Sequence, residues 1–101
     1  ITKETAIPTQ LFHGTNDQLV PYHIAAHHYC KSDSEGYLVL YGSKAIANKL
    51  KKIEQSFYLY TIHKGDHSWS GKPMQLCTTE ILDFLYYDVL KKQKRQINLT
   101  I

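Results

Sequence analysis

Phe57-Tyr58-Leu59-Tyr60-Thr61-Ile62 is the stretch that decides the fold. Its aromatic, aliphatic and β-branched side chains alternate between the two faces of a strand, so both faces carry large apolar groups. This pattern is typical of a strand that is covered on both sides, as in a parallel sheet. Parallel strands need long crossover connections, so helices are expected in the sequence on either side.

Two further elements are predicted before this strand. A β-compatible run at residues 9–13 follows Pro8 and ends at Gly14, as strands often do. An amphipathic helix is expected to begin with Ser43 as its N-cap, because apolar side chains then recur every three or four residues. These side chains are Ile46, Leu50 and Ile53.

The last third of the chain predicts a second helix. Pro73 suits a first helical turn, and apolar residues follow it at helical spacing. The predicted stripe is Met74, Cys77, Ile81, Leu85 and either Val89 or Asp88, and the cations Lys91, Lys92, Lys94 and Arg95 follow at the C-terminal end. The order strand, helix, strand, helix predicts an α/β fold with parallel strands and a right-handed crossover.

Composition places the chain among ordinary globular domains. Its 101 residues are 43% hydrophobic and 21% charged, which predicts one unit over residues 1–101. A net charge of +3 is too small to indicate nucleic-acid binding, and no apolar run is long enough to span a membrane. Because the first residue is Ile1 rather than Met, we expect the chain to be part of a longer protein. Nothing in the sequence indicates a compartment.

The segment between the first strand and the first helix leaves alternatives open. Residues 23–30 suit a helical turn or an irregular loop, and Tyr37–Tyr41 suits a short strand or a buried extended segment. Residues able to bind a metal gather here, although without the paired spacing of a zinc motif: His23, His27, His28 and Cys30. Cys30 and Cys77 could form a single disulfide in an oxidising compartment, or both could be small buried hydrophobic residues.

Asp17 and His67 occupy equivalent positions after the two predicted strands. Asp17 follows the first strand by four residues, and His67 follows the second by five. The carboxyl ends of parallel strands meet at one edge of a sheet, where ligands bind, so these two side chains are expected to meet there. A carboxylate beside an imidazole fixes the tautomer of the imidazole and stabilises its charged form, which suits general acid–base catalysis.

The sequences around these two residues resemble those of α/β-hydrolases. His13-Gly14-Thr15-Asn16-Asp17-Gln18-Leu19-Val20-Pro21 resembles the segment that carries the catalytic acid in esterases, lipases and prolyl-oligopeptidase-like peptidases. Gly65-Asp66-His67 resembles the loop that carries the catalytic histidine of that family. The resemblance runs from about Pro8 to about Leu90 and implies the C-terminal β-α-β-α portion of an α/β-hydrolase sheet. Two features depart from the family pattern: Asp66 stands where a small residue is usual, and 50 residues separate acid from base.

The nucleophile of such an enzyme is not evident in this sequence. The family order is Ser, acid, His, and its Ser lies in a G-x-S-x-G turn. The nearest stretch is Ser32-Asp33-Ser34-Glu35-Gly36, which begins with Ser and follows the acid. The resemblance therefore implies that the chain supplies Asp17 and His67 but no nucleophile, and that it is inactive alone.

The resemblance implies a parent enzyme that hydrolyses carboxylic esters of small molecules through an acyl-enzyme, without a cofactor. The alternatives are a fragment of a prolyl-oligopeptidase-type serine peptidase or a non-catalytic binding module. In the family, the first strand has a neighbour on its other side that this chain does not supply. We therefore expect self-association through the exposed strand edge.

Overall fold

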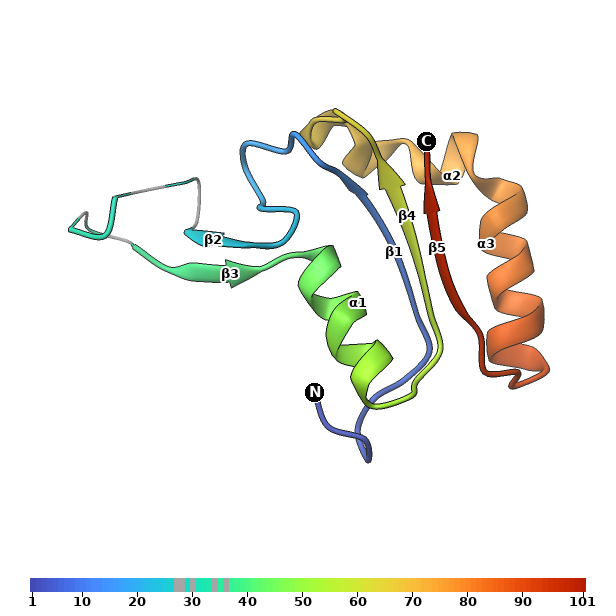
Figure 1. The fold of residues 1–101 in the computed structure, drawn as a ribbon. Helices are drawn as coiled ribbons and strands as arrows, with labels where there is room; N and C mark the ends of the chain where they lie inside the picture. The colour runs from blue at the N-terminus through green and yellow to red at the C-terminus, as the bar shows by residue number, and fades with distance from the viewer. Residues whose placement is uncertain (27–28, 30, 34, 36) are drawn as a thin grey trace.

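The computed structural model describes residues 1–26, 29, 31–33, 35 and 37–101 of the chain (Figure 1). The strands and α-helices are β1 (Thr9–Gly14), β2 (Ile24–Ala26), β3 (Val39–Tyr41), α1 (Ser43–Lys52), β4 (Phe57–Ile62), α2 (Pro73–Leu76), α3 (Thr78–Phe84) and β5 (Gln96–Thr100). A 3-10 helix at His67–Gly71 precedes α2, and a π-helix at Leu85–Leu90 continues α3. The chain is therefore a mixed α/β protein.

β1, β4 and β5 form a parallel sheet with β4 in the middle. Thr9 of β1 lies opposite Phe57 of β4, and Phe57 lies opposite Gln96 of β5. The two strands predicted from the sequence are thus confirmed, as is their parallel pairing. Within the described residues β1 forms one edge of this sheet, and its carboxyl end lies beside that of β4.

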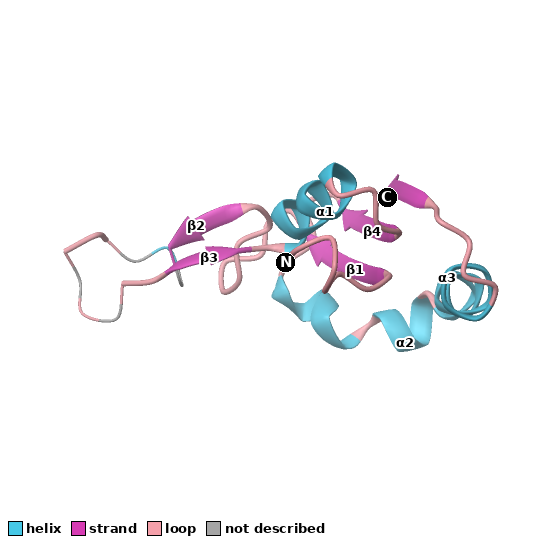
Figure 2. Ribbon diagram, turned by 90° about the horizontal axis from the view of Figure 1, so that it is seen from below, coloured by secondary structure: helices cyan, strands magenta, loops and turns pink. Residues whose placement is uncertain are grey.

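Both faces of β4 are buried, as its sequence predicted. Alternate residues of the strand enter two separate hydrophobic clusters. One cluster contains Ala47, Leu50, Phe57 and Leu59, and the other contains Tyr58, Tyr60, Ile62, Cys77 and Phe84. Helix α1 therefore covers one face of the sheet, while α2 and α3 lie on the other side (Figure 2).

The two crossovers of the sheet have opposite hands. The chain steps from β1 to β4 and then from β4 to β5 in the same direction across the sheet. Because α1 and α3 lie on opposite faces, one crossover must be left-handed. The β1-α1-β4 unit is right-handed, as predicted, so the β4-α3-β5 unit has the uncommon hand (Figures 1 and 2).

The start of α1 differs from the prediction. Gly42, with extended backbone angles, is the N-cap, and Ser43 is the first helical residue. The Ser43 hydroxyl is buried and bonds His13 instead of capping the helix. A Cβ on Gly42 would lie 1.8 Å from the carbonyl oxygen of Pro21, so only glycine fits this approach. The predicted stripe is confirmed, because Ile46, Leu50 and Ile53 all contact the core.

The last helix is broken where the sequence predicted continuity. It bends at Cys77, which separates α2 from α3, and it ends as a π-helix. Met74, Leu85 and Val89 of the predicted stripe are exposed. The residues that turn inward are Cys77, Ile81, Phe84 and Asp88, so of the two alternatives at the end Asp88 is buried. An ion pair with Arg95 accounts for the burial of this carboxylate.

Strand β5 was not predicted. Arg95 was expected among the cations at the helix end, but its guanidinium bonds Asp83 and Asp88 and so ties the start of β5 to the helix. Its position above the Tyr87 ring, 4.9 Å from the centroid, adds a cation–π contact. The alternation of Ile97 and Leu99 with polar neighbours is the sequence signal for this strand.

β2 and β3 form an antiparallel ribbon that projects from the body of the molecule (Figures 1 and 2). Of the alternatives for residues 37–41, a short strand is confirmed at β3, but Val39 and Tyr41 are exposed rather than buried. Residues 24–26, expected in a helical turn or a loop, form strand β2. Among the described helices, none combines the length and the apolar character needed to cross a membrane.

Candidate active site

Asp17 and His67 lie in contact beyond the carboxyl ends of β1 and β4. The Nδ1 atom of His67 is 2.9 Å from Oδ2 of Asp17, across 50 residues of sequence. The side chain of Asp17 is only 6% exposed, whereas that of His67 is 40% exposed. The structure thus brings together the two residues that the sequence singled out, with the carboxylate inside and the imidazole facing solvent.

The loop after β1 holds Asp17 as a carboxylate. Its Oδ1 accepts hydrogen bonds from the backbone N–H groups of Leu19 (2.9 Å) and Val20 (2.8 Å), and Oδ2 faces His67. Burial on its own would raise the pKa of Asp17, but the bonds from Val20, His67 and Leu19 together lower it below the ordinary value of 3.8. The charge on Asp17 is therefore present at neutral pH.

The ionised carboxylate determines which nitrogen of His67 carries the proton. A carboxylate accepts hydrogen bonds only, so the 2.9 Å contact requires a proton on Nδ1 of His67. In the neutral imidazole Nε2 is then unprotonated and can accept a proton from a hydroxyl. The same contact stabilises the imidazolium that forms when Nε2 is protonated.

Gly14 lets the loop that carries Asp17 and the loop that carries His67 approach each other closely. The N–H of Asn16 donates to the carbonyl oxygen of Gly65 at 2.8 Å, and the N–H of Lys64 donates to Oγ1 of Thr15 at 2.8 Å. A Cβ on Gly14 would lie 2.1 Å from that Gly65 oxygen. The two loops are thus joined by one bond between backbone groups and one bond from a backbone N–H to a side chain, and their approach leaves no room for a side chain at residue 14.

Asp66, which departs from the family pattern, has a local structural role. It is the N-cap of the 3-10 helix that begins at His67, and its Oδ1 accepts from the N–H of Ser68 at 2.9 Å and from the Ser68 hydroxyl. These bonds from Ser68 lower the pKa of Asp66 below 3.8. The cap orients the first turn that carries His67, so the acidic residue is compatible with the site.

His13 is a member of the site that sequence reasoning did not identify. Its Nδ1 lies 2.8 Å from the Ser43 hydroxyl, and its Nε2 lies 3.1 Å from the Val20 carbonyl oxygen and 3.4 Å from Oδ2 of Asp17. His13 therefore links the end of β1, the start of α1 and the acid loop. Its position in the His-Gly pair before Asp17 is the only sequence signal for this contact.

A small cavity opens beside the pair. Its volume is about 110 Å³, and its lining includes His67, Asp17, Phe12, Trp69 and Ser70. Trp69 also packs against the core cluster of Tyr60 and Ile62, and Nζ of Lys72 lies 5.3 Å from its ring centroid. The cavity borders the exposed imidazole of His67.

Several sequence hypotheses fall outside the described residues. Ser34, the centre of the nearest nucleophile-like stretch, is one of these, as are His27, His28 and Cys30 of the possible metal cluster and of the possible disulfide. In the part of the chain that the structure describes, no three His, Cys, Asp or Glu side chains are arranged to hold a metal ion. Cys77 is buried, and burial raises the pKa of its thiol above 9.0.

Comparison with known protein families, curated proteins and solved structures finds no significant match to this chain.

Proposed function

We propose that Asp17 and His67 are the acid and the base of a catalytic triad in a serine hydrolase that cleaves carboxylic esters. The observation that supports this most directly is the 2.9 Å contact between the buried, ionised carboxylate and Nδ1 of an exposed histidine. The resemblance around the two residues supplies the reaction class. The fold supports it as well, since both residues follow parallel strands at the edge where ligands bind.

In the proposed reaction His67 transfers one proton in each half of the cycle. Nε2 takes the proton of a serine hydroxyl as its oxygen attacks the ester carbonyl, and the alcohol leaves with that proton. Water then repeats the sequence on the acyl-enzyme, releasing the carboxylic acid and restoring the serine. Asp17 stays ionised throughout and holds the imidazolium. The serine itself comes from outside residues 1–101, so the chain alone is expected to be inactive.

The test uses the complete product of the gene that encodes this chain. We expect it to hydrolyse p-nitrophenyl butyrate and to be labelled by a fluorophosphonate that reacts with activated serines. Asp17→Asn should reduce kcat about 10⁴-fold, because the wrong tautomer of His67 is then favoured. Asp66→Asn is the matched control, since Asn caps the 3-10 helix equally well and should leave the rate unchanged.

Three outcomes would contradict the proposal. The first is a complete gene product that the fluorophosphonate does not label. The second is an Asp17→Asn variant as active as the wild type. The third is phosphonate-sensitive ester hydrolysis by the 101-residue chain on its own. A peptide p-nitroanilide cleaved faster than the ester would retain the same catalytic pair but assign it to a peptidase.

A further inference from the structure

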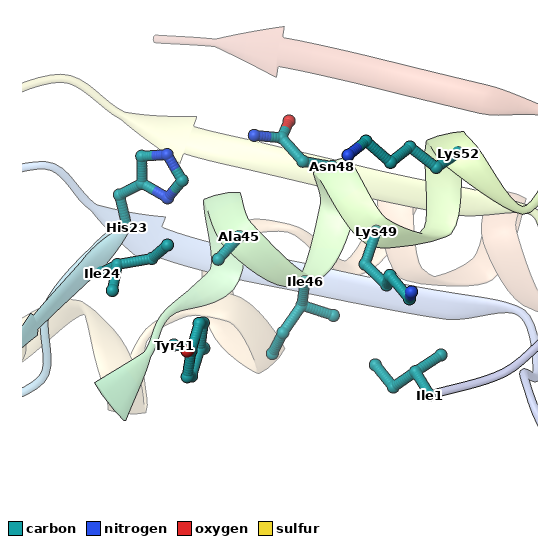
Figure 3. Close-up of a pocket in the computed structure, with 9 residues that line it drawn as sticks. All are labelled: Ile1, His23, Ile24, Tyr41, Ala45, Ile46, Asn48, Lys49 and Lys52. Carbon is teal, nitrogen blue, oxygen red and sulfur yellow. The ribbon is translucent and has the colours of Figure 1, made fainter. Parts of the chain in front are cut away.

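A second cavity lies on the outer side of α1, separate from Asp17 and His67. It has a volume of about 510 Å³, in the range of sites that hold small molecules. Figure 3 shows that it follows the helix, with Ile24 and Tyr41 of the ribbon at one end and Lys49 and Ile1 at the other. None of its lining residues belongs to the candidate active site.

Large apolar side chains line the middle and the ribbon end of the cavity. Ala45 and Ile46 supply the middle, and Ile24 and Tyr41 close the end where the ribbon joins the body (Figure 3). Ile24 is 50% exposed and Tyr41 is 66% exposed, so large apolar surface is left in contact with solvent at this place. A ligand with an apolar chain would cover that surface and gain free energy from its burial.

The charged side chains that line the cavity are both lysines. Among the residues that the structure describes, the lining includes Lys49 and Lys52 and no Asp or Glu. The whole of α1 carries four lysines and no Asp or Glu, so no carboxylate within the helix offsets their charge. His23, beside Ile24 at the ribbon end, and Asn48 add neutral polar groups to the lining (Figure 3). The arrangement is complementary to an anion that lies at the lysine end.

We propose that this cavity binds a medium-chain acyl carboxylate, with the chain along Ile46 and Tyr41 and the carboxylate beside Lys49 and Lys52. The apolar middle suits the chain of such a molecule, and the lysines, which no carboxylate within α1 offsets, suit its head. This proposal does not depend on the proposed hydrolase activity, because the cavity shares no lining residue with the candidate active site. Its test measures binding alone.

The test titrates the ¹⁵N-labelled chain with laurate, below the concentration at which laurate forms micelles, and follows the backbone amide signals. The signals of Ile24, Tyr41, Ile46 and Lys49 should shift and saturate together. Dodecyltrimethylammonium, which has the same chain and a positive head, should bind at least about fivefold more weakly. Acetate, which has the head without the chain, should produce no saturable shift.

Substitutions separate the two halves of the ligand. Lys49→Glu combined with Lys52→Glu should weaken laurate binding about tenfold, and Tyr41→Ser about fivefold. Lys51→Glu is the matched control, because it reverses a charge on the same helix outside the cavity. All four positions are exposed, so these variants are expected to fold, and unshifted signals from β4 would verify this.

The proposal is overturned if laurate leaves the named signals unmoved or shifts a different set. It is also overturned if Lys51→Glu weakens binding as much as the double variant does, since general electrostatic attraction would then account for the effect. If acetate binds as tightly as laurate, the apolar side chains of the cavity do not contribute to binding, and the proposal fails. Binding only to anionic lipid vesicles, with no response to monomeric laurate, would assign the surface to a membrane instead.

Discussion

Replacing Asp17 by Asn should reverse the tautomer of His67. In the wild type the ionised carboxylate accepts the proton of Nδ1, so Nε2 is the unprotonated nitrogen. Asn can keep its carbonyl oxygen toward the N–H groups of Leu19 and Val20, which now bond Oδ1. Its NH₂ group then faces His67 and donates, so Nδ1 must become the acceptor and the proton moves to Nε2.

The size of the effect follows from the contact that is lost. A hydrogen bond to a charged acceptor contributes about 1.5–3 kcal/mol. His67 is 40% exposed, so solvent screens the contact and the lower end, about 1.5 kcal/mol, applies. Since about 1.4 kcal/mol corresponds to a factor of ten, the Nδ1–H form should exceed the Nε2–H form about tenfold in the wild type. The same loss should lower the free energy of unfolding of the variant by about 1.5 kcal/mol.

Long-range ¹H–¹⁵N correlation spectra distinguish the two tautomers of neutral histidine, and they need no substrate and no nucleophile. The signals of His67 are assigned by their loss in His67→Gln. Asp66→Asn removes the other nearby carboxylate without removing a contact to the imidazole, so it should leave the tautomer unchanged. The reasoning is refuted if wild-type His67 is mainly protonated on Nε2, or if Asp17→Asn folds and the proton stays on Nδ1.

Four further outcomes are expected. Acidification below pH 3.8 should destabilise the wild type more than Asp17→Asn. The folded state lowers the pKa of Asp17, so this residue stabilises the fold only while its carboxylate is ionised. Urea midpoints of the two proteins that change in parallel with pH would contradict this. Gly14→Ala should cost about 3 kcal/mol in urea unfolding, since its Cβ would lie 2.1 Å from the Gly65 oxygen, and a neutral result would disprove the close approach. Arg95→Met should cost about 3 kcal/mol by leaving Asp88 buried without its partner, and Arg95→Met with Asp88→Leu should recover most of that loss. Sedimentation velocity should show oligomers that grow with concentration through the open edge of β1, and a monomer at high concentration would exclude this.

The parts of the fold that the sequence predicted are those whose local pattern agrees with their tertiary surroundings. β4 is apolar on both faces, and helices cover both of them. The apolar stripe of α1 packs against one of these faces. Asp17 and His67 could be paired from the sequence because parallel strands place the residues that follow them at one edge. The period of the side chains carried the information for β4 and α1, and the position after the strands carried it for Asp17 and His67.

The missed features depend on contacts between residues far apart in the chain. The stripe of the last helix turns inward at Phe84 and Asp88 rather than at Leu85 and Val89, because Asp88 pairs with Arg95. Helical spacing offered either Val89 or Asp88 at this position and could not choose between them, because the choice depends on the partner Arg95. Ser43 suits an N-cap by propensity, but the imidazole of His13 lies 2.8 Å away and binds its hydroxyl instead.

The candidate catalytic pair is organised by local structure within residues 13–67. The backbone N–H groups that hold Asp17 lie two and three residues after it. The two loops are bonded through the Asn16 N–H and the Gly65 carbonyl oxygen, and through the Lys64 N–H and the Thr15 hydroxyl oxygen. None of these bonds involves a nucleophile or a substrate. The tautomer of His67, which the proposed triad requires, is therefore set by contacts within residues 13–67. It follows that the spectroscopic test can refute the assignment of the base on the chain of 101 residues, while the enzymatic test addresses the nucleophile separately.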